Sequence, residues 1–319
     1  MKKTAHKVLH IIFPALTIAA LTIQTFVLLA KTSYFFELFT HYAVYYATAW
    51  TALAVIALLK KRFACALLLL TVAGINSAEI APYFLHVQTQ TGTTAEDHQT
   101  EMNFSVLSSN FYYQNQNTKA LLTLAKKENP TILVIHEASE IWRPLLPEIQ
   151  KTYPYSYLTQ ETGVDGILIA SRTTGTFTKI PLSTSFGLLF TPENGPEVLA
   201  VHPFAPLNAM LAKGRNEQFA DLATFAKKLA ANNKPLIVIG DFNCTPFSPY
   251  FKDLLNSSGL IDTRIGEGIL PSWHSGFSPF KIPIDHALVS AELKQKVTFF
   301  KTLPAIEGTD HLPIEITID

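Results

Sequence analysis

The amino-acid sequence predicts an α/β domain preceded by an N-terminal transmembrane segment. Long apolar runs fill residues 1–85, which hold seven Lys/Arg and only two acids, whereas from residue 102 short β-like runs alternate with amphipathic helical spacing. With 319 residues there is room for one large domain beside such a segment. We therefore expect a transmembrane segment at 1–85, a linker at 86–101 and a domain at 102–319. The linker lacks apolar periodicity, which predicts a flexible tether.

Three apolar stretches of the first segment are long enough to cross a membrane as helices, namely residues 8–30, 42–59 and 63–85. The hydrocarbon core of a bilayer is about 30 Å thick and needs about 20 helical residues. A cleaved signal peptide is the alternative for the first stretch, because Lys2 and Lys3 precede it. The two further stretches argue against that alternative. We expect residues 8–85 to lie in the lipid bilayer.

Basic residues in the short loops predict the orientation. Lys2, Lys3 and Lys7 precede the first stretch and residues 60–62 (KKR) separate the second from the third, whereas only Lys31 lies between the first two. The positive-inside rule then places the N-terminus and residues 60–62 in the cytoplasm. Three crossings put the domain on the other side. We expect a multi-pass protein of the inner (cytoplasmic) membrane whose domain is non-cytoplasmic (periplasmic or extracytoplasmic).

Local patterns place the elements of the domain. Helical spacing predicts helices at residues 118–127 and 216–231, and the pattern suits one α/β sandwich with a substantial core. No glycine-rich nucleotide-binding signature occurs, so nucleotide-cofactor folds have no support. Apolar runs predict strands at residues 102–111, 131–136, 165–171, 197–202, 235–240, 284–290 and 312–318.

Polar side chains follow most of these strands. Each one by itself fits a turn or a solvated loop. Together they supply the carboxylates, amides and imidazoles that metal-assisted hydrolysis needs, so we expect them to form one site. These residues are Asn110, Glu137, His202, Asp241, Asn243, Asp285, Asp310 and His311.

The motifs around these residues resemble the endonuclease/exonuclease/phosphatase superfamily of deoxyribonuclease I-like proteins. They are IHEAS around Glu137, GDFN at 240–243, IDHALVS at 284–290 and GTDHLPI at 308–314. The resemblance covers residues 102–319, and the N-terminal segment looks like that of bacterial membrane-tethered members. It implies a four-layer α/β sandwich, with two sheets face to face, helices outside, and an active site at one end.

The resemblance also implies a metal site. Glu137 matches the carboxylate that binds Mg²⁺, Asn110 lies beside it, and Asp310 matches a further acid at the metal. Ligands that are all oxygen favour Mg²⁺ (or Mn²⁺) over zinc.

Five residues match catalytic positions. Asp241 corresponds to the residue that positions or deprotonates the attacking water, and Asn243 to the one that contacts phosphate and nucleophile. Asp285 matches the acid that orients the catalytic histidine, His311. His202 matches the histidine that assists the leaving oxygen or contacts the phosphate.

The sequence thus predicts a membrane-anchored, Mg²⁺-dependent phosphodiesterase, with nucleic acid and lipid or small phosphodiesters both open as substrates. From residue 100 onward 18 Lys/Arg face 21 Asp/Glu without a basic run, which counts modestly against nucleic acid. Tyr112 stands where abasic endonucleases place an acid, so one possible metal ligand is missing. No obligate protein partner is inferred. The alternative is a non-catalytic binding or scaffold protein that retains the fold.

Overall fold

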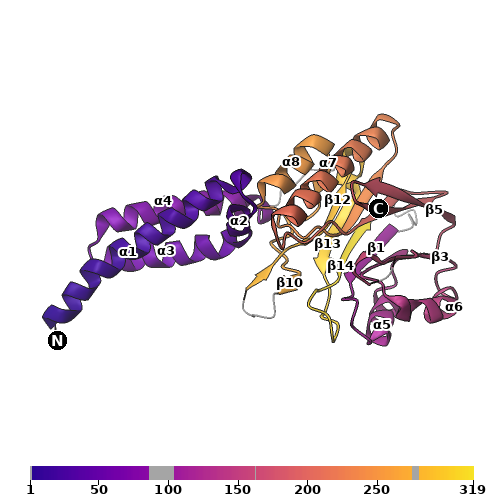
Figure 1. The fold of residues 1–319 in the computed structure, drawn as a ribbon, viewed down its shortest axis with the longest axis horizontal. Helices are drawn as coiled ribbons and strands as arrows, with labels where there is room; N and C mark the ends of the chain where they lie inside the picture. The colour runs from indigo at the N-terminus through magenta and orange to yellow at the C-terminus, as the bar shows by residue number, and fades with distance from the viewer. Residues whose placement is uncertain (1, 86–103, 162, 275–279) are drawn as a thin grey trace, which may run out of the picture.

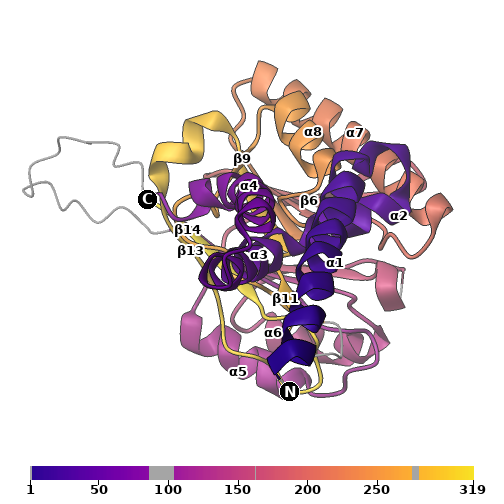
Figure 2. The same ribbon diagram turned by 90° about the vertical axis from the view of Figure 1, so that its left-hand side faces the viewer.

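The structure, a computed structural model, describes residues 2–85, 104–161, 163–274 and 280–319. The expected linker at 86–101 and the first two residues of the expected strand at 102–111 lie outside these ranges. A bundle of long helices extends from one side of an α/β domain (Figure 1). Viewed from the end of the bundle, its helices project from the middle of the domain (Figure 2).

Three helices of the bundle are long and apolar enough to cross a membrane by length and composition, which matches the three expected stretches. They are α1 (Lys2–Leu28), α3 (Ala43–Leu59) and α4 (Phe63–Ile80). Small buried residues line their contact, among them Ala20, Ala54 and Ala73, which lets the helix backbones approach closely. Short helices α2 (Tyr34–Glu37) and η2 (Leu38–Tyr42) follow η1 (Ala30–Thr32) between α1 and α3, and η3 (Ala81–Tyr83) follows α4.

Two six-stranded mixed sheets form the centre of the domain. The first has the strand order β13-β14-β1-β2-β4-β3 and the second β5-β6-β7-β8-β12-β9. Apolar side chains of both sheets meet in one buried cluster that includes Val134 and Ile239. The first sheet consists of β1 (Phe104–Asn110), β2 (Ile132–His136), β3 (Tyr155–Leu158), β4 (Ile167–Ser171), β13 (Val297–Thr302) and β14 (Ile314–Ile318). The second consists of β5 (Gly175–Leu182), β6 (Ser185–Pro192), β7 (Glu197–Val201), β8 (Leu236–Asp241), β9 (Ile261–Asp262) and β12 (Asp285–Val289).

Helices cover the outer face of each sheet. Leu121 of α5 (Thr118–Glu128) packs with Leu107 and Leu133 of the first sheet. On the second sheet, Phe219 and Leu222 of α7 (Ala209–Ala231) pack with Val238, together with α8 (Pro249–Ser258). The order helix, sheet, sheet, helix confirms the expected four-layer α/β sandwich. The smaller elements are η4 (Glu140–Leu145), α6 (Leu146–Ile149), η5 (Gly163–Asp165), β10 (Trp273–His274), β11 (Lys281–Ile282) and η6 (Ala291–Lys296).

All seven expected strands are present, and both expected helices are confirmed. Helix α7 begins seven residues earlier than its apolar spacing indicates, because the Asn208 side chain caps it by accepting from the Leu211 backbone N–H at 2.9 Å. Helix α8 and several strands, most of them short or at sheet edges, were not expected from the sequence. The largest omission is the β5–β6 hairpin, whose partly exposed first strand has a weak alternation of apolar residues.

Strand register places the polar strand ends next to each other. Parallel β1 and β2 put Asn110 opposite His136, directly before Glu137. Antiparallel β8 and β12 put Asp241 opposite Asp285. Strand β14 runs antiparallel to β1, so the chain just before it returns to the same edge.

Gly240 creates the space for this arrangement. Its φ is +151°, and an added Cβ would lie 2.0 Å from the Val201 carbonyl oxygen and 2.8 Å from the His136 Nε2 atom. Real Cβ atoms do not approach backbone so closely, so only glycine fits between β7 and the His136 ring without a shift of β8.

We expect Gly240→Ala to destabilise the domain by about 3 kcal/mol, through both clash and backbone strain. This corresponds to a fall in Tm of roughly 6–12 °C. Gly259 is the matched control, because its φ is +77° but nothing lies within 4 Å of an added Cβ. Gly259→Ala should cost only about 1 kcal/mol of strain. Thermal unfolding of the full chain in detergent measures both, and equal losses would show that the clash at Gly240 is unimportant.

Candidate active site

The candidate active site lies where polar ends of the two sheets meet. Asn110 and Glu137 come from β1 and from the residue after β2 in the first sheet. Asp241 ends β8, and Asp285 begins β12 in the second sheet. Most of the expected site residues therefore converge from both sheets.

Asn110 joins the carboxylates of the two sheets. Its Nδ2 donates to Glu137 Oε1 at 3.1 Å and to Asp241 Oδ2 at 3.1 Å. Its Oδ1 accepts from the Tyr112 backbone N–H at 3.2 Å, so Asn110 acts here as a donor between two acids. For Asn110 to serve as a metal ligand, its amide would have to turn over.

Glu137 is held in a strained backbone conformation. Its φ is +55°, which is uncommon for a residue with a Cβ. The strain aims the side chain into the site, where Oε2 accepts from the Tyr113 backbone N–H at 3.0 Å. Residues in such conformations cluster at functional sites, because the surrounding structure must compensate for the strain.

His311 and Asp285 form a buried pair. The Nδ1–H of His311 donates to Asp285 Oδ2 at 2.9 Å, which leaves Nε2 facing Asp241 Oδ2 at 3.6 Å. The backbone N–H of Asp285 donates to Ser272 Oγ at 3.1 Å. The expected orienting acid and histidine therefore lie together.

His202 and Asn243 lie on the other side of Asp241. The Nδ1–H of His202 donates to the Val164 carbonyl oxygen at 3.0 Å, and Nε2 lies 3.6 Å from Asp241 Oδ2 and 4.0 Å from Glu137 Oε1. The backbone N–H of Asn243, whose φ is +49°, donates to Asp241 Oδ1 at 2.8 Å. Its Nδ2 donates to the Pro203 carbonyl oxygen at 3.0 Å.

The two histidines stabilise the negative charge of Asp241. Burial opposes the charged form of His311, but Asp285 and Asp241 outweigh it and raise its pKa to about 10. Burial likewise opposes the imidazolium of His202, yet Asp241 and Glu137 raise its pKa. For Asp241, burial favours protonation, but His311 and His202 hold its pKa well below the usual range. Asp241 is therefore anionic and lies 3.6 Å from each of the two rings, and that of His311 is cationic at neutral pH.

Asp310 contacts strand β10 beside the site. Its Oδ2 accepts from Trp273 Nε1–H at 2.9 Å, and its backbone carbonyl accepts from the His274 N–H at 3.3 Å. Asp310 does contribute to raising the pKa of His311.

The donor set fits a divalent cation. Glu137 and Asp241 are tied by one amide and offer oxygen lone pairs that the contacts above do not use. Oxygen of Asp241, oxygen of Asp285 and a ring nitrogen of His311 also lie within 4.8 Å of one another. Because His311 Nδ1 is committed to Asp285, we interpret that second group as the hydrogen-bonded pair rather than as a metal site.

The residues that support the site were not expected from the sequence. Ser272, just before β10, and Trp273, its first residue, bind Asp285 and Asp310, and this part of the sequence carries no recognisable motif. His136 is fully buried beside His202, and burial lowers its pKa to about 3, so it is neutral. Both of its ring nitrogens lack a hydrogen-bond partner among the described residues. Only its position directly before Glu137 could have drawn attention to it.

Solved structures of other proteins share this fold. A 3′ phosphatase NExo from Neisseria, bound to a product DNA hairpin, superposes with a TM-score of 0.60 at 20% identity, covering 68% of this chain and 99% of that one. An AP endonuclease from Archaeoglobus fulgidus gives a TM-score of 0.58 at 14% identity, covering 68% and 99%. Truncated TDP2 from Caenorhabditis elegans gives 0.54 at 19% identity, covering 68% and 98%. At these identities the likeness concerns the fold.

A curated relative matches over a shorter stretch. Nocturnin from Drosophila melanogaster is 43% identical over 58 residues, which is 18% of this chain and 9% of Nocturnin. The match is therefore local and does not extend to the whole of either protein.

A family model covers most of the chain. The model of the Endonuclease/Exonuclease/phosphatase family matches residues 103–311, a range that contains every expected site residue. The match agrees with the four-layer fold and with the convergence of carboxylates, amides and imidazoles at one end of it. The chain accordingly belongs to the Endonuclease/Exonuclease/phosphatase family, a family of phosphoric ester hydrolases.

Proposed function

We propose that this protein is a membrane-anchored phosphodiesterase that uses Mg²⁺ (or Mn²⁺) and acts on the non-cytoplasmic side. The observation that carries the hydrolase assignment is the hydrogen-bonded series Glu137–Asn110–Asp241 facing the His311–Asp285 pair. A scaffold that only retained the fold would not need to keep these buried charges paired across two sheets.

The helical bundle supports the anchoring. Three helices have the length and composition of membrane spans, and many of their large apolar side chains are exposed, including Ile11, Leu59 and Leu67. Such surfaces are costly in water and favourable in lipid.

The arrangement of the bundle supports the orientation. The turn with residues 60–62 lies at the bundle end away from the domain (Figure 1), whereas Lys31 lies at the near end and pairs with Asp253 of the domain. If the basic turn is cytoplasmic, the domain lies on the opposite side of the inner membrane.

Glu137 is the residue best placed to hold the metal ion, with Asp241 joined to it through Asn110 and Asp310 as a further acid. A bound divalent cation supplies charge neutralisation at the phosphoryl oxygens and the leaving oxygen. An all-oxygen set of this kind favours Mg²⁺ or Mn²⁺.

The remaining residues have separate tasks. Asp241 accepts a hydrogen bond from the attacking water and, with Asn243, orients it in line with the scissile bond. His311, kept cationic by Asp285, donates from Nε2 to a phosphoryl oxygen as negative charge builds. His202 presents its Nε2–H to the leaving oxygen or the phosphate, because its Nδ1–H is committed to Val164.

The substrate class is either nucleic acid or a lipid or small phosphodiester. Exposed Tyr112 and Tyr113 stand beside Glu137 with ring centroids 5.4 Å apart, and exposed aromatic rings can stack on bases. The bundle in turn holds the domain close to lipid headgroups. A panel of single-stranded DNA, duplex DNA and phospholipid vesicles, tested with the full chain, separates these substrates.

We expect Glu137→Gln to lower the rate by roughly 10²-fold or more, because the variant keeps the size but loses the anionic ligand. The assay is hydrolysis of bis(p-nitrophenyl) phosphate by the full chain in detergent across a series of Mg²⁺ concentrations. Glu140→Gln is the control, since Glu140 is exposed and pairs with Arg143. An unaltered Mg²⁺ dependence in Glu137→Gln would remove Glu137 from the metal site.

We expect Asp285 and His311 to behave as one unit. His311→Ala should cost about 10²–10³-fold in kcat, as for loss of a preorganised donor. Asp285→Asn should also lose activity, and the double variant should be little slower than His311→Ala alone. Steady-state kinetics of the three variants measures this. If the loss of kcat in the double variant equals the product of the losses in the two single variants, Asp285 and His311 do not act together.

We expect reporter fusions after residue 95 to be active only with a reporter that works outside the cytoplasm. Fusions after residue 61 should show the reverse, because the positive-inside rule retains that turn in the cytoplasm. Cytoplasmic reporter activity after residue 95 would reverse the orientation. Replacing residues 60–62 with glutamates should give mixed topology in the same assay.

A further inference from the structure

The segment between the first two bundle helices is built into the domain. This connecting segment, residues 29–42, packs against the β8–α8 loop, residues 242–248, which directly follows Asp241. The contact is separate from residues 86–101, which also join the two parts of the chain.

A buried ion pair lies at the centre of this contact. Arg215 Nη2 of α7 donates to Glu37 Oε2 at 2.6 Å and to Oε1 at 2.7 Å, and both side chains are 0% exposed. Ser248 Oγ of the loop donates to Glu37 Oε1 at 2.6 Å. Glu37 therefore binds the helix and the loop of the domain at once.

The same contact reaches the candidate active site. Arg215 Nη1 donates to the Asn243 carbonyl oxygen over a long 3.4 Å, and Asn243 has the strained φ of +49°. His41 Nδ1 and Thr245 Oγ1 share a hydrogen bond of 2.9 Å. Two residues of the connecting segment, Glu37 and His41, thus hold the loop that carries Asn243 in place.

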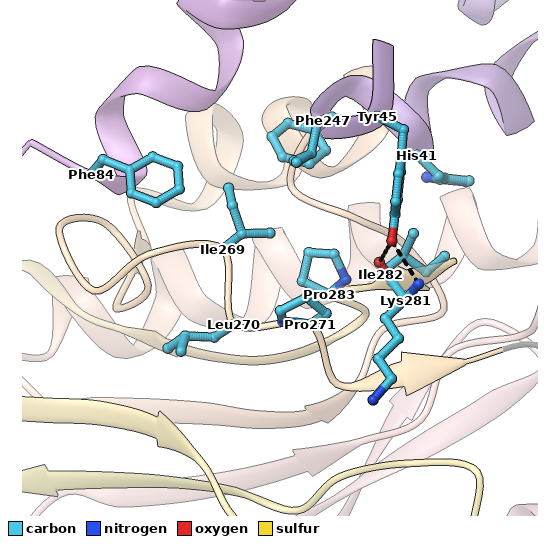
Figure 3. A pocket seen from close by; sticks show the side chains of 11 residues that line it. His41, Tyr45, Phe84, Phe247, Ile269, Leu270, Pro271, Lys281, Ile282 and Pro283 are labelled. Carbon is cyan, nitrogen blue, oxygen red and sulfur yellow. Dashed lines mark hydrogen bonds between the residues drawn. The ribbon is translucent and has the colours of Figure 1, made fainter. Parts of the chain in front are cut away.

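Apolar and backbone contacts complete the junction. Phe247 of the loop packs with Ala43 and Tyr83, its ring centroid 5.8 Å from that of Tyr83. The Gly268 N–H donates to the Tyr83 carbonyl oxygen at 2.6 Å. His41, Tyr45 and Phe84 of the bundle line a cavity of ≈370 Å³ together with Phe247 and Ile269 of the domain, as Figure 3 shows. The bundle and the domain therefore share a packed interface in addition to their covalent connection.

Desolvation makes the pair hard to separate. Water cannot solvate the Arg215 side chain, because that side chain is fully buried. Removing Glu37 would therefore leave the positive charge of Arg215 buried without a compensating negative charge. Replacing both charges by apolar residues of similar size removes this penalty. The two kinds of change therefore separate a role in stability from a role in aligning the loop.

We infer that Glu37 and Arg215 are positioning residues, through which the membrane segment holds the β8–α8 loop and Asn243 in catalytic geometry. The inference rests on the proposed hydrolase function. It implies that the membrane segment is part of the active-site framework, so that residues 102–319 alone would lack Glu37, the carboxylate that pairs with Arg215, and would keep only its hydrogen bonds to Asn216 and the Asn243 carbonyl.

Four variants of the full chain in detergent test this inference. Glu37→Gln and Arg215→Met should each lower both Tm and kcat. The double variant Glu37→Leu/Arg215→Met should recover most of the Tm while kcat stays about 10- to 100-fold low, because small misplacements are costly at a reacting centre. Lys31→Gln is the control, since the exposed Lys31–Asp253 pair bridges the same two parts without touching the loop. It should alter neither quantity.

Amide hydrogen exchange in residues 242–248 gives a readout that does not depend on activity. Exchange there should be at least about tenfold faster in the double variant than in the wild type, because the loop has lost its support. Recovery of kcat together with Tm, or unchanged exchange, would overturn the positioning role. A wild-type protein without metal-dependent hydrolysis would instead refute the proposed function, and the exchange result would still decide whether the connecting segment holds the loop.

Discussion

The structure depends on the pairing of buried negative charge at the adjoining ends of two sheets. Asp241 and Asp285 lie opposite each other on neighbouring strands and are almost fully buried. Two carboxylates so placed repel each other and pay a desolvation cost. His311 and His202 stabilise the negative charge of Asp241, whereas burial and Asp241 still raise the pKa of Asp285. The two histidines reach the site only because strands of both sheets end at the same edge.

Several local features serve that arrangement at some cost in stability. Glu137 and Asn243 adopt φ values that most residues avoid, and His136 is buried without hydrogen-bond partners among the described residues. Gly240 leaves room for the His136 ring beside the Val201 carbonyl. The large apolar cluster between the sheets provides the stability that permits these local costs.

Buried charges are also paired at the junction of the bundle and the domain. A charge that is removed from water needs a partner of opposite sign, and Glu37 finds it in Arg215, 178 residues away along the chain. The Arg215 guanidinium also lies 5.6 Å from the ring centroid of Phe219 and 5.7 Å from that of Tyr250. The domain is thus held against the helical bundle by contacts that extend to the loop that carries Asn243.

Much of the architecture was determined by the sequence itself. Apolar period and run length are local properties, so they sufficed for three long helices, seven strands and two covering helices. The partly exposed β5 of the β5–β6 hairpin and the short strands were not predicted, because their alternation of apolar and polar residues is weak. The motifs after the strands also indicated which residues would converge, since strands of a sheet commonly end at one edge.

Only the tertiary structure decided how these residues are used. It turned Asn110 into a donor between Glu137 and Asp241 and directed Asp310 toward Trp273. It also brought Glu37, a lone acid in an apolar segment, to Arg215. Contacts between residues far apart in sequence leave no local pattern, because hydrogen-bond geometry and desolvation arise only when the sheets and helices are packed.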